Sequence, residues 1–146
     1  MIEEAKEELE KIRVLCQRSV SEGEFNHSHN EQLEKHCTVL RNNSHVDTWI
    51  PSLFELVEEF GEDVDLTLGS PGPIVHSIEE TSPTYEQYLV ASLARKPTGL
   101  SMWMTERIYR TPGKDSDFWI KELKSIIVHP NATPSAIEDS DWIEDL

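Results

Sequence analysis

The 146-residue sequence predicts an all-α fold of about eight short helices in antiparallel pairs, arranged as a small α-solenoid or helical bundle. Two observations support this class. Apolar residues recur at spacings of three and four along most of the chain. Prolines also follow a hydroxyl residue at several points where such a stretch begins. A chain of this length with 37% apolar residues is expected to form one domain, spanning residues 1–146.

The first three helices are predicted from their apolar stripes. They cover about 2–20, 30–41 and 47–60. Gly61 is expected to end the third, because glycine is favoured just beyond a helix C-terminus. The apolar residues of 64–68 alternate with polar ones, and we expect an extended connection there whose apolar side chains enter the core.

Hydroxyl–proline pairs mark most of the later helix starts, because the hydroxyl can cap free N–H groups and proline suits the first helical position. The pairs are Ser70-Pro71, Ser82-Pro83 and Thr133-Pro134, and Pro97 follows the same logic. The helices predicted in this part of the chain cover about 71–80, 83–95, 97–110, 115–128 and 134–145. Trp103 and Trp119 are expected in the core, as are Ile137, Trp142 and Leu146 of the last helix. The alternative interpretation of this tail is an acidic, aromatic binding segment around Trp142.

The chain is strongly acidic, with a formal net charge of −15. Residues 42–94 contain ten acids and neither Lys nor Arg, for a net charge of −10 in that segment. Such a chain repels polyanions, which argues against direct binding to nucleic acid or to an anionic membrane surface. A basic protein is the complementary partner.

The sequence contains no run of 18 apolar residues, and its first ten residues carry five Glu where a secretory signal needs positive charge. We therefore expect a cytoplasmic protein. Cys16 and Cys37 are expected to be buried, reduced thiols in that compartment.

The acidic residues of the third predicted helix form the main candidate binding surface. Glu55, Glu58, Glu59 and Glu62 repeat at three and four and so share one face, opposite Leu53, Val57 and Phe60. Asp63 and Asp65 extend this face, and Glu79 and Glu80 form a second acidic point. The alternative interpretation is a solvated helix face with no partner.

Other patterns indicate structure more than chemistry. A loose cluster of possible metal ligands lacks the paired halves of a zinc site, so we expect neither metal nor cofactor. Residues 69–73 lack the phosphate-loop pattern and are interpreted as a helix cap. Arg95, Lys96, Arg107 and Arg110 are expected to neutralise carboxylates of neighbouring helices or of a partner. The members of the metal-like cluster are His27, His29, His36, Cys37 and His45.

Two segments carry a family resemblance: DVDLTLGSPGPIVHSIEE at 63–80 and YEQYLVASLARKPTGLSMWMTERIYR at 85–110. An LGSPGP segment leads into a helix, and an RKPT segment precedes a W-M-x-x-R-I helix. This pattern, over roughly 47–110, resembles a group of bacterial immunity proteins encoded beside polymorphic or contact-dependent toxins. The family pattern often has Asn where this chain has Glu106. The resemblance implies a HEAT-like helical fold and tight binding to one cognate toxin, often a nuclease.

The charge pattern favours the same function, because a nuclease toxin needs a basic working surface that an acidic inhibitor can cover. We therefore expect an immunity protein that acts by stoichiometric occlusion and is not an enzyme. Two alternatives stay open. One is a helical adaptor with no toxin partner. The other is an enzyme that uses Asp63 and Asp65 for metal-assisted hydrolysis.

Overall fold

The computed structural model describes residues 2–68, 71–138 and 140–146, and within them the protein is all-helical, which confirms the predicted fold class. These residues form eight α-helices and one 3₁₀ helix, and no strand. The elements are α1 (Ile2–Glu22), α2 (His27–Arg41), α3 (Val46–Phe60), α4 (Pro73–Glu79), α5 (Glu86–Arg95), α6 (Gly99–Tyr109), α7 (Ser116–Ile127), α8 (Pro134–Glu138) and η1 (Asp141–Asp145).

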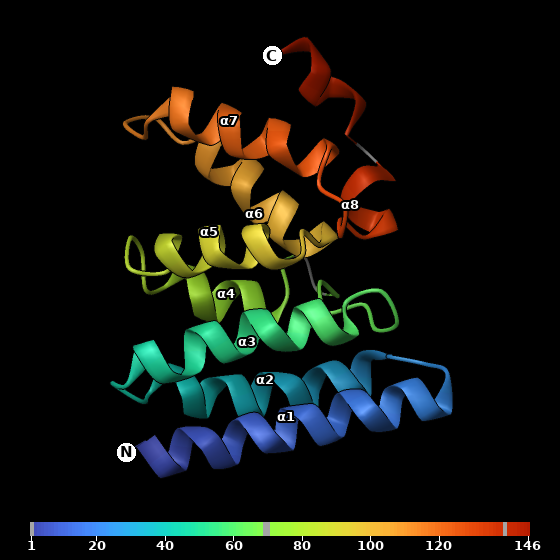
Figure 1. The fold of residues 1–146 in the computed structure, drawn as a ribbon. Helices are drawn as coiled ribbons and strands as arrows, with labels where there is room; N and C mark the ends of the chain where they lie inside the picture. Colours follow the sequence, from blue (N-terminus) through green and yellow to red (C-terminus); the bar gives the residue numbers. More distant parts are fainter. Residues whose placement is uncertain (1, 69–70, 139) are drawn as a thin grey trace.

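The helices stack in chain order, with the N-terminus at one end of the molecule and the C-terminus at the other (Figure 1). Along the stack α1 contacts α3, α3 contacts α5 and α5 contacts α7, while α2 contacts α4 and α6 contacts α8. Sequence neighbours such as α1 and α2, or α6 and α7, pack across between these two rows. Such an arrangement of two rows of helices is compatible with a small α-solenoid.

Capping side chains set several helix starts. Asn26 accepts hydrogen bonds from the N–H groups of Ser28 and His29, and the His29 ring bonds back to the Asn26 N–H. This reciprocal cap begins α2 three residues earlier than the apolar stripe predicts. Thr98 and Ser101 form the same arrangement at α6. The start of α6 is therefore set by Thr98, two residues after the position predicted from Pro97.

The hydroxyl–proline prediction is confirmed at Thr133-Pro134, where α8 begins. It is wrong at Ser82-Pro83, because residues 81–85 form turns and α5 begins only at Glu86. The helix predicted from 71 begins at Pro73. Gly69 and Ser70, part of the proposed cap, lie outside the described residues.

The core runs through the whole stack and includes fully buried Trp49, Phe54 and Leu89. The prediction for 64–68 is confirmed in part: Val64 and Leu66 are buried, and Asp65 between them is exposed. The connection is not extended, because residues 66–68 form a turn, and Leu68 is only half-buried.

Taken together, the predictions for Trp103, for Trp119 and for the last helix are confirmed only in part. Trp119 is buried as predicted, but Trp103 is only partly buried. The described part of the predicted helix 134–145 consists of α8 and η1. Ile143 is buried in the core, whereas Ile137, predicted to be buried, is 37% exposed.

Candidate functional site

The fold brings cations from other segments to the acids of residues 42–94. Half of the ten acids in that segment form such ion pairs, which join residues far apart in sequence. The pairs are Arg13 with Glu59, Arg41 with Glu80, Arg95 with Glu58, Arg107 with Glu79, and Lys114 with Glu86. The prediction that Arg95 and Arg107 neutralise carboxylates of neighbouring helices is therefore confirmed.

These ion pairs divide the acidic face predicted on α3. Glu58 faces α5, where Arg95 donates two hydrogen bonds to it and Ser92 a third. Glu59 faces α1 and pairs with Arg13. Because α3 lies between α1 and α5, its flanking carboxylates meet cations on both sides. Glu79 and Glu80 are also committed, to Arg107 on α6 and Arg41 on α2.

The other four predicted site residues make no ion pair among the residues that the structure describes: Glu55, Glu62, Asp63 and Asp65. All four are exposed. Glu55 lies on α3 and the other three lie on the loop that follows it. We call these four residues the unpaired acidic set.

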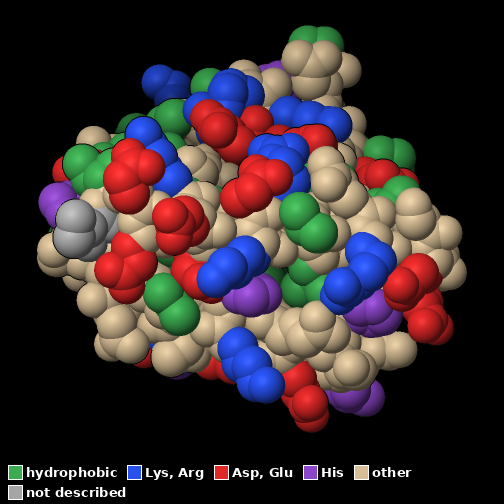
Figure 2. All heavy atoms as spheres, turned by 90° about the horizontal axis from the view of Figure 1, so that it is seen from below, with side chains coloured by type: hydrophobic (Ala, Val, Ile, Leu, Met, Phe, Trp, Pro, Cys, Tyr) green, Lys and Arg blue, Asp and Glu red, His purple; other side chains and the backbone are tan. Residues whose placement is uncertain are grey.

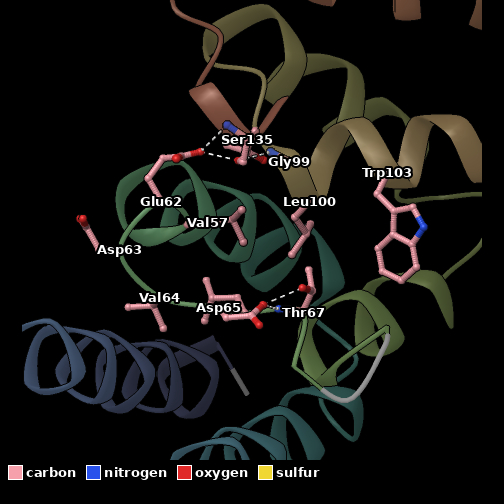
Figure 3. Close-up of a pocket in the computed structure, with 13 residues that line it drawn as sticks. Val57, Glu62, Asp63, Val64, Asp65, Thr67, Gly99, Leu100, Trp103 and Ser135 are labelled. Atoms are coloured by element: carbon pink, nitrogen blue, oxygen red, sulfur yellow. Dashed lines mark hydrogen bonds between the residues drawn. The ribbon is translucent and has the colours of Figure 1, made fainter. Parts of the chain in front are cut away.

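Three members of this set line a cavity of about 680 Å³ between the 61–67 loop, the end of α3 and the first turns of α6 and α8. Val57 and Leu100 point into it from opposite helices, and buried Leu66 adds a third apolar wall (Figure 3). Trp103 stands at one edge. The cavity thus combines apolar walls with an acidic rim.

Glu62 is held at the rim by α8. Its carboxylate accepts hydrogen bonds from the N–H and the hydroxyl of Ser135, and the Ser135 hydroxyl also accepts the Gly99 N–H at 3.2 Å. Partial burial raises the pKa of Glu62, but the hydrogen bonds from Ser135 and Thr133 outweigh it and hold the pKa below 4.5. Glu62 is therefore ionised at neutral pH.

Asp65 is fixed by its own turn. Its Oδ1 accepts the Thr67 N–H at 3.1 Å and the Thr67 hydroxyl at 2.7 Å, an arrangement favoured by Asp in turns. Its second oxygen, Oδ2, accepts no hydrogen bond from any residue in the described part of the chain. Asp63 stands at the outer edge of the cavity, and its side chain has no hydrogen-bond partner in the described part of the chain.

The face formed at the α1–α2 end of the stack has a different character. Figure 2 shows acidic and basic side chains interspersed there. The N-terminal acids include Glu8, which pairs with Lys11 and with the His36 ring, and Glu22, which pairs with His29. These contacts pair acids at that end with nearby cations, whereas the acids at the cavity rim form no ion pair among the described residues, and Lys96 attracts Glu62 only at longer range.

The metal-like cluster of the sequence is dispersed in the fold. His29 and His36 bond to different carboxylates, and Cys37 is buried. Across residues 2–68, 71–138 and 140–146 no three His, Cys, Asp or Glu side chains come together in a way that suits a metal ion. None of the described helices is both long and apolar enough to cross a membrane.

Sequence reasoning missed the α6 and α8 contributions to the cavity. The helical spacing of Leu100 indicates only a buried residue, and the sequence around Ser135 indicates only a helix start beside a proline. Only the packing of α8 against α6 brings them to the loop that follows α3. Comparison with protein families, with curated proteins and with solved structures gave no match for this chain.

Proposed function

We propose that this protein is an immunity protein, which binds a basic toxin domain in the cytoplasm and neutralises it by stoichiometric occlusion, without catalysis. One observation carries the proposal. The acids of residues 42–94 that the fold leaves without an ion pair include three that share the rim of one apolar-walled cavity. The net charge of −15 and the resemblance of residues 63–110 to immunity proteins support it further.

The distribution of ion pairs assigns different weights to the eight predicted acids. Four of these acids each form an ion pair with an arginine of the same chain: Glu58, Glu59, Glu79 and Glu80. Such a pair carries little net charge, so it attracts a distant basic protein less than an unpaired carboxylate does. The unpaired acidic set has no such partner and steers a basic protein toward the cavity. In protein interfaces, buried apolar contacts at the centre supply most of the affinity, and charges at the rim raise the association rate.

The first test is co-expression with toxin domains encoded by neighbouring genes. We expect one toxin to be neutralised, scored by rescue of growth, and to co-purify with this protein at a fixed stoichiometry. Rescue without a stable complex would contradict occlusion. A stable complex with a non-toxic partner, and no rescue by this protein, would favour the adaptor function.

The second test compares acids of the two kinds in the complex. Asp63→Asn/Asp65→Asn removes two unpaired charges, and Glu79→Gln/Glu80→Gln removes two paired ones. We expect the first variant to associate about tenfold more slowly at low salt and to show a weaker salt dependence. The second removes the same number of charges from residues that do not line the cavity, so it should change the rate about threefold or less. Equal effects would contradict the assignment.

The hydrolase alternative needs a metal held by Asp63 and Asp65. In this structure Asp65 Oδ1 already accepts two hydrogen bonds from Thr67. Asp63 lies at the outer edge, away from the cavity centre (Figure 3). Calorimetric titration with Mg²⁺ and Mn²⁺ distinguishes the two functions. We expect no saturable heat, and a site occupied at micromolar metal would favour the enzyme.

A further inference from the structure

The cavity beside the 61–67 loop has the volume of a binding site. Its 680 Å³ lies within the range of roughly 300–1,000 Å³ that small-molecule pockets occupy. Its walls come from three helices and one loop. Val57, Leu66 and Leu100 form the buried apolar floor, with 1%, 3% and 6% of each residue exposed, and half-buried Trp103 adds more accessible apolar surface at one edge. A polar ligand without an apolar portion would leave this surface unused.

The rim restricts the charge of an occupant. Glu62 and Asp65 lie on opposite sides of the cavity and Asp63 at its outer edge (Figure 3). The residues described as lining it include no Lys, Arg or His. An anion would be repelled, and a neutral apolar group would take water from carboxylates without replacing their hydrogen bonds. The complementary occupant has an apolar stem that ends in a cation.

We propose that the cavity receives an arginine side chain of the basic partner. The aliphatic stem would lie along Leu100 and Trp103, and the guanidinium would donate to Oδ2 of Asp65, which accepts no hydrogen bond from the described residues. Arginine fits this site better than lysine because its planar donors can bind a carboxylate through two hydrogen bonds, and because its guanidinium is more weakly hydrated.

The rim is prepared for such a ligand before it binds. Glu62 is held by Ser135, and Asp65 by Thr67, so neither carboxylate has to be ordered on binding. Trp103, at the edge of the cavity, already contacts one cation: the Cζ atom of Arg107 lies 5.3 Å from the centroid of its ring. Its indole N–H is therefore a useful reporter for a second cation entering beside it.

The inference rests on the proposed function for the source of the arginine, but its test needs no toxin. The ¹⁵N-labelled protein is titrated with acetyl-Gly-Arg-Gly-amide, and with the same peptide containing citrulline or lysine. Citrulline keeps the shape of arginine and removes its charge. We expect the arginine peptide to shift the amide signals of residues 61–67, of Gly99 and Leu100, and the indole signal of Trp103.

The citrulline peptide should bind at least about tenfold more weakly, because a charge-assisted hydrogen bond is lost. Asp63→Asn/Asp65→Asn should weaken the arginine peptide by about tenfold or more. Asparagine at 65 keeps an acceptor for the Thr67 bonds, and the Asp63 side chain bonds to none of the residues 2–68, 71–138 and 140–146, so this variant is expected to fold. Asp117→Asn, an exposed acid on α7, is the matched control and should leave binding unchanged.

Equal binding of arginine and citrulline peptides, or shifts confined to other surfaces, would overturn the inference. Equal binding of the lysine peptide would overturn the choice of arginine. If the peptide occupies the cavity but no toxin is neutralised, the proposed function fails and the cavity assignment stands. If a toxin is neutralised while the arginine peptide shifts none of these signals, the proposed function stands and the cavity assignment fails.

Discussion

Arg95 and Glu58 join α5 to α3 through two parallel hydrogen bonds, Nε to Oε1 at 3.0 Å and Nη2 to Oε2 at 2.7 Å. The two residues are 37 positions apart in sequence. Only 12% of the Glu58 side chain is exposed, so its carboxylate depends on this arginine and on the Ser92 hydroxyl for hydrogen bonds. The contact gives Glu58, a residue of the predicted binding face, a structural role as well.

Removing this arginine should destabilise the protein. Arg95→Ala leaves the Glu58 carboxylate largely buried with only the Ser92 hydroxyl, and we expect the free energy of unfolding to fall by about 1–3 kcal/mol. Urea denaturation followed by circular dichroism measures the change. Lys6→Ala is the control, because Lys6 and Glu3 are 4.0 Å apart and largely exposed. It should change stability by less than about 0.5 kcal/mol.

Glu8 should make stability fall at acid pH. Burial raises its pKa, but the hydrogen bonds from Lys11 and His36 outweigh burial and hold the pKa below 4.5. The unfolded chain therefore takes up this proton at a higher pH than the folded one. The resulting stability is fully present above about pH 4.5, and it is lost as pH falls through the lower, folded pKa.

The measurement is the urea midpoint of the wild type and of Glu8→Gln between pH 7 and pH 3. We expect the variant to be less stable at pH 7 and the difference to shrink as pH falls below about 4.5. Glu7→Gln, an exposed neighbour on α1, should show a difference that is near zero at every pH. A constant difference for Glu8→Gln would contradict this linkage.

The two cysteines should resist alkylation in the folded protein. Burial raises the pKa of the Cys16 thiol to about 11 and that of Cys37 to about 12, and both thiols are unbridged. At pH 8 we expect iodoacetamide to react at least about a hundredfold more slowly than with a free thiol, because the thiolate is the nucleophile. In urea both cysteines should react at ordinary rates, as mass spectrometry would show. Rapid labelling of the native protein would indicate that α1 and α2 separate readily.

Gly72 and Gly113 form a matched pair for testing the loop that carries the acidic rim. Both have a backbone φ of +89°, a value that residues other than glycine rarely adopt. A Cβ at Gly113 would meet nothing within 4 Å, whereas one at Gly72 would lie 2.8 Å from the Leu66 carbonyl oxygen. Gly113→Ala should therefore cost only the backbone strain, about 1–2 kcal/mol.

Gly72→Ala should cost about 3 kcal/mol or more, because the same strain is joined by a clash with the loop backbone. Thermal denaturation of the two variants gives the comparison. Because Leu66 belongs to the cavity wall, Gly72→Ala should also shift the amide signals of residues 64–68. Equal stability of the two variants would mean that the loop backbone at Leu66 moves away from the new Cβ without a loss of free energy.

Local patterns predicted much of the fold. The apolar spacing predicted the first three helices, the later predicted helices overlap α4 to α8, and the alternation over 64–68 correctly predicted that Val64 and Leu66 are buried. Helix starts were predicted less well. Turns at 81–85 delayed α5, and the Asn26–His29 cap extended α2, because such ends depend on individual hydrogen bonds that a periodicity does not register.

The candidate site was predicted only as a list of acids. Glu55, Glu58, Glu59 and Glu62 have equivalent spacing in the sequence, yet Arg13 and Arg95 reach two of them and Ser135 a third. The Arg13–Glu59 contact spans 46 positions. Counting charges by segment cannot identify such pairs, because it measures composition along the chain and not distance in space.

The sequence by itself determined that the protein is helical, acidic and amphipathic, because helix formation and burial follow a period that neighbouring residues impose. The tertiary structure decided which carboxylates remain unpaired and where apolar surface stays open beside them. Those properties depend on the packing of α3 against α1 and α5, and of α8 against α6. Ion pairs and cavities form where segments distant in sequence meet, and only the folded chain brings those segments together.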